Sequence, residues 1–313
     1  RKYNQENTTA GGESLWEIPF ADSRGRMLFT FAVRHDAVDQ FQAMGTNKGG
    51  VNGPLPFVFY DYDQADTRRD VTCVPYKWGA AVNGKSKQEL TDLQTWYFGK
   101  YRFEWMKRIA SAPNDDGVNK IYMRYAEVLL IAAEAANELE GAGSAAVYLK
   151  EIRRRAFAPA NQAVKVDAYV DALTSKDAMM NAIIEENKLE FTGELERKYA
   201  LIRWNLLKTK LDEAKVKMTD LKARTGKYQD VPKTLYYKYQ DDGFTLDIYG
   251  LNRGETQAPV GYTSKSWDKL EDNKITTLYK AGVNPDKRQF WPIWQTFIDG
   301  SNGKLVNDWV FGN

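Results

Sequence analysis

The amino-acid sequence predicts a mainly α-helical fold that carries a loop-rich lobe with short strands. Apolar residues recur every three or four positions over 119–136 and again over about 175–207, which is the spacing of one helix face. The preceding part instead holds clusters of glycine, proline and aromatic residues, which are typical of loops and short strands. We therefore predict a loop-rich aromatic lobe over 1–116, a helical part over 117–207, and a long excursion with a C-terminal extended segment over 208–313.

The composition is that of a folded globular chain with nearly balanced charge. Of the 313 residues, 43% are hydrophobic, and 44 Lys and Arg face 42 Asp and Glu, a formal net charge of +2. Such a balance provides no overall field to attract nucleic acid or an anionic membrane surface, so we expect no nucleic-acid partner. No run approaches the roughly 20 apolar residues that a transmembrane helix needs.

A single cysteine and a single histidine limit the chemistry of the chain. Cys73 cannot form an internal disulfide, and His35 alone leaves the usual zinc ligand sets incomplete. A nucleophilic pair of Cys73 and His35 is a minor alternative, because a lone thiol is more often a small buried hydrophobe. We therefore predict no metal and no cofactor.

Short strands and one long loop are expected in the lobe. The runs 14–20 and 27–33 are β-like and are separated by a turn signal at 22–25. Residues 45–56 hold four glycines and two prolines, which favours a surface loop. Aromatic, strand-like sequence resumes at 96–103.

A helical hairpin is expected next. Gly141 and Gly143 end the first helix, and Ser144 is a candidate N-cap for the second. The first helix stripe comprises Tyr122, Tyr125, Leu129, Ala132 and Ala136, and the second helix presents Val147, Leu149, Ile152 and Phe157. The pair is roughly the size of a tetratricopeptide unit.

A longer helical pattern follows, and then periodicity is lost. Over 175–207 the spacing persists, with Gly193 placed to kink or divide the helix. Residues 217–286 lose the pattern and are predicted to be a partly ordered excursion over the surface. The apolar segment 288–294, broken by Pro292, is expected to be an extended strand edge packed against the core.

Two groups of acidic residues could carry chemistry. Glu185, Glu186, Glu190 and Glu194 cluster on the predicted long helix, and those four positions apart lie close enough for the two carboxylates of a retaining glycosidase. Interleaved Lys and Arg favour a salt-bridge lattice instead. Asp61, Asp63 and Asp66 are spaced like the start of a calcium loop, yet its later glycine and glutamate are absent. A turn that pairs these aspartates with Arg68 or Arg69 is the favoured alternative.

Aromatic residues in polar loops are the better signal for a binding site. Thirteen per cent of the chain is Phe, Trp or Tyr. A pyranose ring has a C–H face and a hydroxyl rim, so flat rings held out to solvent beside polar side chains suit it. We predict stacking by Trp78 and Trp96, with Tyr60, Tyr62 and Tyr97 as further contacts; the alternative for each ring is a small local core.

Four segments, in this order along the chain, are typical of one family. They are Lys100-Tyr101-Arg102, the hairpin 124–156 with Ile152-Arg153-Arg154-Arg155-Ala156, the stretch 186–204, and Phe290-Trp291-Pro292-Ile293 with Asn307-Asp308-Trp309 beyond it. The combination closely resembles the SusD/RagB family. The chain departs from the family pattern at Asn187 and within 193–197, while Glu186, Glu190, Arg197, Leu201, Arg203 and Trp204 agree with it.

The resemblance implies a scaffold of tetratricopeptide-like helical repeats, and a lipoprotein on the outward-facing surface of the Bacteroidota outer membrane. Members of the family capture oligosaccharides, or peptides in the RagB branch, for a SusC-like TonB-dependent transporter. They are usually longer, with earlier helical repeats and a lipidated N-terminal cysteine, so we expect this chain to be a C-terminal portion whose lipid anchor lies outside it.

We therefore predict a non-catalytic protein that binds oligosaccharides for polysaccharide utilisation. A RagB-type peptide-binding protein and a glycoside hydrolase that uses the helix glutamates are the alternatives.

Overall fold

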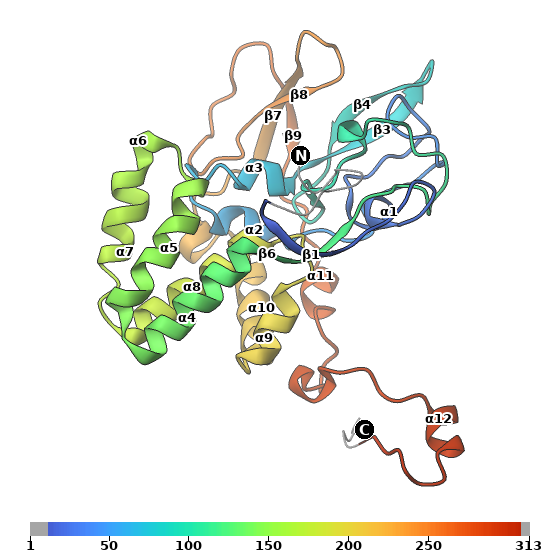
Figure 1. The fold of residues 1–313 in the computed structure, drawn as a ribbon. Coiled ribbons are helices and arrows are strands. Elements are labelled where there is room, and N and C mark those ends of the chain that lie inside the picture. Colours follow the sequence, from blue (N-terminus) through green and yellow to red (C-terminus); the bar gives the residue numbers. More distant parts are fainter. Residues whose placement is uncertain (1–11, 308–313) are drawn as a thin grey trace.

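Three antiparallel helices form a layer at one side of the molecule (Figure 1). The computed structural model describes residues 12–307. Helices α4 (Tyr125–Leu139) and α5 (Ala142–Ala156) form the predicted hairpin, and α8 (Lys176–Phe191) packs on both. Small residues at the contact, such as Ala133 and Ala145, are fully buried, so the helix axes can approach closely. Between α5 and α8 lie α6 (Pro159–Gln162), a π-helical segment (Ala163–Ala168) and α7 (Tyr169–Asp171).

The long helical pattern is divided where the sequence predicted a break. Helix α8 ends at Phe191, and α9 (Arg197–Arg203) begins only after Gly193 and Leu195, whose φ angles are 86° and 73°. Left-handed residues cannot continue an α-helix, so the chain turns here. Helix α10 (Leu207–Ala223) follows, where the sequence predicted the start of an irregular excursion. Its buried residues are Leu207, Ala214, Met218 and Leu221, which lie on one face of the helix. The sequence did not reveal this face, because many lysines stand between its few apolar residues.

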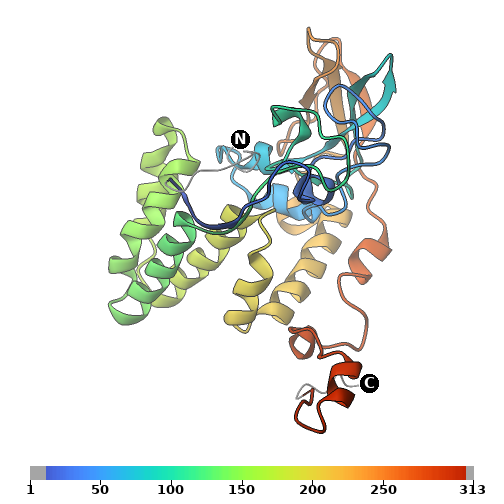
Figure 2. The same ribbon diagram turned by 45° about the vertical axis from the view of Figure 1, so that its right-hand side comes forward.

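Short antiparallel ribbons build the lobe. Strand β1 (Ser14–Ile18) pairs with β6 (Lys120–Arg124), β2 (Cys73–Val74) with β5 (Tyr97–Phe98), and β3 (Tyr76–Val82) with β4 (Lys85–Leu90). Farther along the chain, β7 (Thr234–Tyr239) lies between β8 (Leu246–Tyr249) and β9 (Thr263–Ser266). Seen from the side, this sheet stands above α10 (Figure 2). The predicted excursion over 217–286 therefore contains a helix and a sheet.

Several short helices replace predicted strands or loops. They are α1 (Met27–Phe31), α2 (Pro56–Asp61), α3 (Arg69–Thr72), the 3-10 turns Phe103–Trp105, Gly226–Tyr228 and Pro285–Arg288, and α11 (Asp272–Thr276). Helix α1 was predicted as a strand; the carboxylate of Asp116 accepts the N–H of Leu28 at 2.7 Å, a contact with a residue 88 positions away. Local sequence cannot reveal such a cap.

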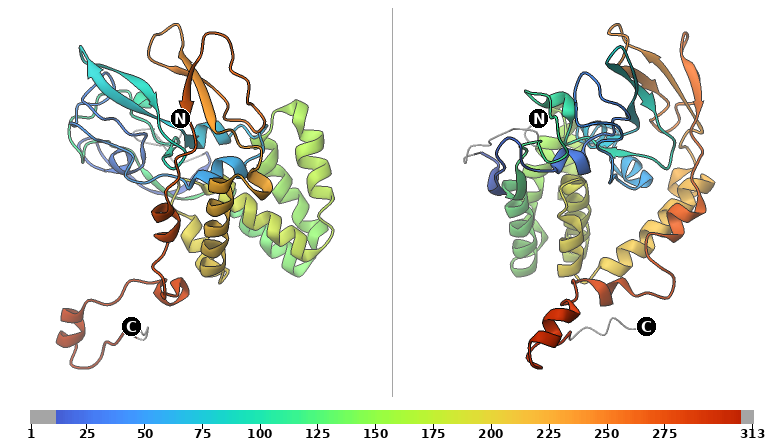
Figure 3. Two further views of the ribbon diagram at one scale, coloured as in Figure 1. Left: turned by 180° about the vertical axis from the view of Figure 1, so that it is seen from behind. Right: turned by 90° about the vertical axis from the view of Figure 1, so that its right-hand side faces the viewer.

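The C-terminal segment leaves the body of the molecule (Figure 3). Phe290 is 53% and Trp291 94% exposed, and helix α12 (Gln295–Gly300) lies at the far end. The prediction of a strand edge packed against the core is therefore wrong for the described residues. Asp308 and Trp309, the end of the C-terminal segment used for the family resemblance, lie outside them.

The lone histidine sits in the core of the lobe. His35 is fully buried; its Nδ1 lies 2.7 Å from the Asp39 carboxylate and its Nε2 3.8 Å from that of Glu104. Burial alone would lower the pKa of His35, but the two carboxylates outweigh it and raise this pKa above the ordinary value. The imidazolium form is therefore the one that the fold stabilises.

We predict that this stabilisation is lost as the pH rises. Because the folded pKa exceeds the unfolded one, the contribution of His35 to the free energy of unfolding is complete below about pH 6.5 and disappears as the pH passes the folded pKa. The difference in unfolding free energy between wild type and His35→Gln, measured in urea from pH 5 to 9, should shrink over that interval. The single imidazole signal in NMR gives the folded pKa directly, and a value below about 6.5 would contradict the assignment.

Candidate functional site

The two tryptophans predicted to stack on a ligand are buried. Trp78 is 2% and Trp96 3% exposed. The indole N–H of Trp78 donates to the Glu104 carboxylate at 2.8 Å, and that of Trp96 donates to the Leu93 carbonyl at 2.9 Å. Their ring faces meet other rings: Trp78 stacks on His35, and Trp96 stacks on Phe59. The prediction that these rings are held out to solvent is wrong, because loops from distant parts of the chain close over them as local cores.

The three predicted tyrosines are also buried. The Tyr60 hydroxyl accepts the indole N–H of Trp267 at 3.0 Å, and Tyr62 donates its hydroxyl hydrogen to the Leu189 carbonyl at 2.6 Å. Tyr97 packs in the lobe core with Trp78. None of the three presents an exposed ring, which corrects the prediction. Tyr60 and Tyr62 nevertheless border a hollow in the surface, whereas Tyr97 does not.

That hollow is one of two that meet between the lobe and the helical layer. The first, about 320 Å³, is bordered by Tyr60, Tyr62, Gln64 and Arg253. The second, about 560 Å³, lies against the π-helical segment and α8. Both hollows are lined by Asp63 and Lys165, whose carboxylate and ammonium group are 2.6 Å apart. We refer to the two together as the Asp63–Lys165 cleft.

The second hollow contains the partly exposed ring that the sequence analysis missed. Tyr169 is 40% exposed, and the Arg153 guanidinium lies 4.1 Å from the centre of its ring. Tyr169 directly follows the π-helical segment Ala163–Ala168. Such segments cost stability and are often found at functional sites. The only signal in the sequence was an aromatic residue between two helices.

The cleft offers mixed polar and aromatic contacts. Asp63 and Lys165 keep 34% and 40% of their side chains exposed, so their remaining hydrogen-bonding capacity faces solvent. Tyr169 adds a ring, and Gln64 adds an amide that can donate and accept. Hydroxyl groups on a ring-shaped ligand need such paired donors and acceptors beside a flat apolar surface.

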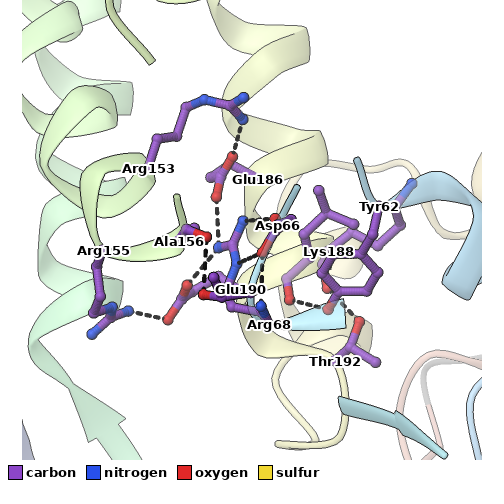
Figure 4. A network of polar contacts seen from close by, with 12 residues as sticks. Tyr62, Asp66, Arg68, Arg153, Arg155, Ala156, Glu186, Lys188, Glu190 and Thr192 are labelled. Atoms are coloured by element: carbon purple, nitrogen blue, oxygen red, sulfur yellow. Dashed lines mark hydrogen bonds and ion pairs between the residues drawn. The ribbon is translucent and has the colours of Figure 1, made fainter. Parts of the chain in front are cut away.

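Two of the glutamates considered as alternative catalysts, Glu186 and Glu190, lie in a buried ion-pair network (Figure 4). Glu190 is 3% exposed and pairs with Arg68 at 2.7 Å, Arg124 at 2.6 Å and Arg155. Glu186 pairs with Arg68 at 2.7 Å and with Arg153 at 2.6 Å. Ion pairing is therefore confirmed for these residues, but their partners are distant arginines and not the interleaved Lys and Arg that the sequence analysis named; within 12–307, only Glu185 pairs with one of those, Lys188.

The network extends toward the lobe through Glu194. Its carboxylate accepts from the Arg124 guanidinium at 2.7 Å and from the Lys100 ammonium. Lys100 also donates to the main-chain carbonyl of Glu190 at 2.7 Å. Lys100, Arg124, Arg153, Glu186, Glu190 and Glu194 all belong to the segments that carried the family resemblance.

The environment of Glu190 does not suit acid–base catalysis. Burial by itself would raise the pKa of this carboxyl, but Arg124, Arg68 and Arg155 hold it far below its usual range. A general acid at a glycosidic bond needs the opposite shift. Glu186, Glu190 and Glu194 also have their oxygens occupied by cations rather than turned toward a bound ligand.

The structure also does not support a calcium site at the lobe aspartates or a nucleophilic role for Cys73. Asp61 pairs with Lys188 at 2.8 Å and Lys217 at 2.9 Å, while Asp66 pairs with Arg68 at 2.6 Å, as the turn alternative expected. Within 12–307, no group of three or more acidic, histidine or cysteine side chains is arranged to hold a metal ion. Cys73 is buried, and burial raises the pKa of its thiol, which opposes nucleophilic reactivity.

Comparison with known proteins defines the class of this chain. The model of the SusD family matches residues 41–308, so the chain belongs to the SusD family. Among curated relatives, SusD-like protein P2 of Formosa agariphila is 34% identical over 155 residues, which cover 48% of this chain and 30% of that protein. SusD-like protein P25 of the same organism is 35% identical over 117 residues, or 37% of this chain and 20% of the relative.

Solved structures share the fold. A SusD homologue from Bacteroides thetaiotaomicron superposes with a TM-score of 0.62 at 18% identity, covering 94% of this chain and 51% of its own. The surface glycan-binding protein A of B. thetaiotaomicron in complex with laminarihexaose gives 0.50 at 19% identity, covering 95% and 52%. The chain thus spans about half the length of these two solved relatives. Among the described helices, none is both long and apolar enough to cross a membrane.

We predict that Glu190→Gln destabilises the fold. The amide keeps the shape but removes the negative charge shared by Arg124, which is buried, Arg68, which is largely buried, and the half-exposed Arg155; this should cost about 3 to 5 kcal/mol of unfolding free energy. Urea denaturation followed by circular dichroism measures the loss. Glu185→Gln is the matched control on the same helix, because Glu185 is 44% exposed and pairs only with Lys188 among the described residues; its cost should stay within about 1 kcal/mol. Equal costs for the two variants would contradict the role of the network.

Proposed function

We propose that this protein binds oligosaccharides at the cell surface, without catalysis, and delivers them to a SusC-like TonB-dependent transporter in the outer membrane. The Asp63–Lys165 cleft is the observation that carries the proposal, since it combines a partly exposed ring with exposed polar side chains on a SusD fold. A solved protein of this fold, bound to laminarihexaose, supports a glycan as the ligand. Attachment to the outer membrane by a lipid anchor is part of the same proposal and rests on the family.

The absence of catalysis is inferred from the side chains. The glutamates on α8 that a hydrolase could use are held in ion pairs, and the pKa of Glu190 is shifted away from that of a general acid. In the cleft, Asp63 is paired with Lys165, and its pKa is lowered: burial opposes this shift, but the hydrogen bond from Lys165 outweighs it. An acid kept ionised can accept hydrogen bonds from hydroxyl groups but cannot donate a proton to a leaving group.

A glycan in the cleft would use Tyr169 for stacking and Asp63 as an acceptor. Arg153 covers one part of the Tyr169 ring, and 40% of the residue is open to the hollow. The buried tyrosines at positions 60 and 62 support the wall from behind and do not provide a stacking face.

We predict that Tyr169→Ala weakens oligosaccharide binding by about 1 to 3 kcal/mol, by analogy with the stacking of bases on aromatic side chains. Calorimetric titration with laminarihexaose and a panel of other oligosaccharides provides the measurement, together with assays for released sugar. Tyr125→Ala is the matched control, because Tyr125 is 46% exposed on α4 and borders neither hollow of the cleft.

The same titrations discriminate the alternatives. If the wild type binds an oligosaccharide and both tyrosine variants lose the same amount of affinity, the cleft is not the binding site, but the proposed function still holds. No binding to any glycan, with binding to a peptide library, would replace the proposal by the RagB-type alternative. Release of sugar from the panel by the wild type would overturn the proposed lack of catalysis.

A further inference from the structure

A third hollow lies apart from the two that form the Asp63–Lys165 cleft, and it has no part in the proposed glycan site. It is open, with a volume of about 510 Å³, and it is bordered by α9, α10, the end of α8 and the segment that leads into α2. We call it the α9–α10 groove. Its apolar lining includes Leu55, Phe57, Val58, Phe191, Leu201 and Leu211.

The groove carries an excess of positive charge. Six basic side chains border it, against two carboxylates, Glu185 and Glu213. The basic residues are Lys120, Lys188, Arg197, Lys198, Lys210 and Lys217. An apolar lining with a cationic border selects a ligand that is apolar on one side and negatively charged at its edges.

Part of this charge is neutralised, because Lys210 pairs with Glu213 at 2.9 Å and Lys188 pairs with Glu185. The rest is not neutralised within the described residues. Arg197 donates to the Ile184 carbonyl at 2.7 Å and to the Asn187 side-chain oxygen at 3.0 Å, and both acceptors are neutral. Burial lowers the pKa of Arg197 to about 10, and the carboxylates of Glu185 and Glu213, which form no ion pair with it, offset this only in part. In the part of the chain from 12 to 307, Lys198 forms no ion pair either. At the other end, Lys188 and Lys217 share Asp61 with a third lysine, Lys227.

A strained residue presents an apolar side chain to the groove. Leu195 has a φ of 73°, in the left-handed region that a leucine rarely adopts because its side chain crowds the backbone there. Its side chain gains little in return, since the residue is 39% exposed and borders the groove. A strained backbone that holds leucine toward solvent is explained if another molecule covers that leucine.

We propose that the α9–α10 groove docks an amphipathic α-helix whose apolar stripe is flanked by acidic residues. A small anionic amphiphile carries one charge, whereas the basic groups that lack a carboxylate of their own among the described residues come from three separate elements: Lys120 on β6, Lys198 on α9, and Lys217 on α10, which has only its share of Asp61. Charges spread in this way require several anionic groups on a rigid frame. The exposed Tyr199 on α9 borders both this groove and the adjacent hollow against α4, whose lining includes Glu127, Glu134 and Glu196, so the cationic face ends at Tyr199.

The test is titration of the full chain with synthetic helical peptides of about 18 residues, five turns long. One peptide carries a leucine stripe flanked by glutamates, a second has the same stripe flanked by lysines, and a third is a scrambled form of the first. We expect binding of the first alone, weakening as salt is added.

Two variants locate the binding on the groove. Leu195→Asn should weaken the glutamate-flanked peptide about tenfold, because a buried leucine contact is lost, while the unfolding free energy stays unchanged or rises, since asparagine tolerates the left-handed conformation. Lys198→Glu should weaken that peptide about fivefold and strengthen the lysine-flanked one. Lys107→Glu, an exposed lysine in the lobe, is the matched control and should change neither affinity.

The same experiments also test whether something other than an acidic helix occupies the α9–α10 groove. Equal binding of the glutamate-flanked and lysine-flanked peptides, or binding of neither at millimolar concentration, would overturn the proposal. It would also fail if vesicles of phosphatidylglycerol bound the chain while the peptides did not, or if sedimentation revealed self-association abolished by Leu195→Asn. If helix docking is not observed, the glycan proposal still stands, because none of the three protein variants changes a residue of the Asp63–Lys165 cleft.

Discussion

The buried ion pairs around Glu190 hold the two halves of the structure together. Arg68 comes from the lobe, Arg124 from the strand that enters α4, Arg155 from the end of α5, and Glu190 from α8. Burying several charges is expensive unless every one is compensated, so these elements are confined to one mutual arrangement. The network thus fixes the orientation of the lobe against the helices, and with it the two hollows that meet at Asp63 and Lys165. A protein that must hold a ligand-binding surface in a constant shape gains from such a rigid junction.

The aromatic residues of the lobe, which the sequence analysis expected to stack on a ligand, mostly pack inside the protein. Long loops without regular structure cannot bury a continuous apolar face, and here they close over Trp78 in one core and over Trp96 and Trp267 in another. Each indole found a hydrogen-bond acceptor inside the protein, which removes the cost of burying its N–H. In the proposed glycan site, contacts to a ligand are consequently left to a few partly exposed side chains at the edges of these cores. The buried rings give the loops their shape, and only Tyr169 in the cleft offers part of a ring to a ligand.

Polar contacts divide the surface into two chemically different regions. In the Asp63–Lys165 cleft, acids and bases alternate and neutralise one another, which suits a ligand with many hydroxyl groups and no charge. In the α9–α10 groove, cations outnumber carboxylates around an apolar lining. One fold therefore presents a neutral polar surface and a cationic apolar surface, separated by α8 and the ion pairs of Asp61.

The sequence by itself determined the helices with strong periodicity, the break at Gly193 and the family. These features depend on contacts three or four positions apart, or on motifs that are read as continuous segments. The cations that pair with Glu186 and Glu190 come from 33 to 122 positions away and were decided by the tertiary structure. Only the tertiary structure decided whether Trp78 and Trp96 face solvent or a core, that Met27–Phe31 forms a helix, and that Tyr169 and Lys165 meet Asp63 at one cleft. The physical reason is that burial and caps in loop-rich regions come from residues about 90 or more positions away, as with Asp116 at Leu28 and Lys165 at Asp63.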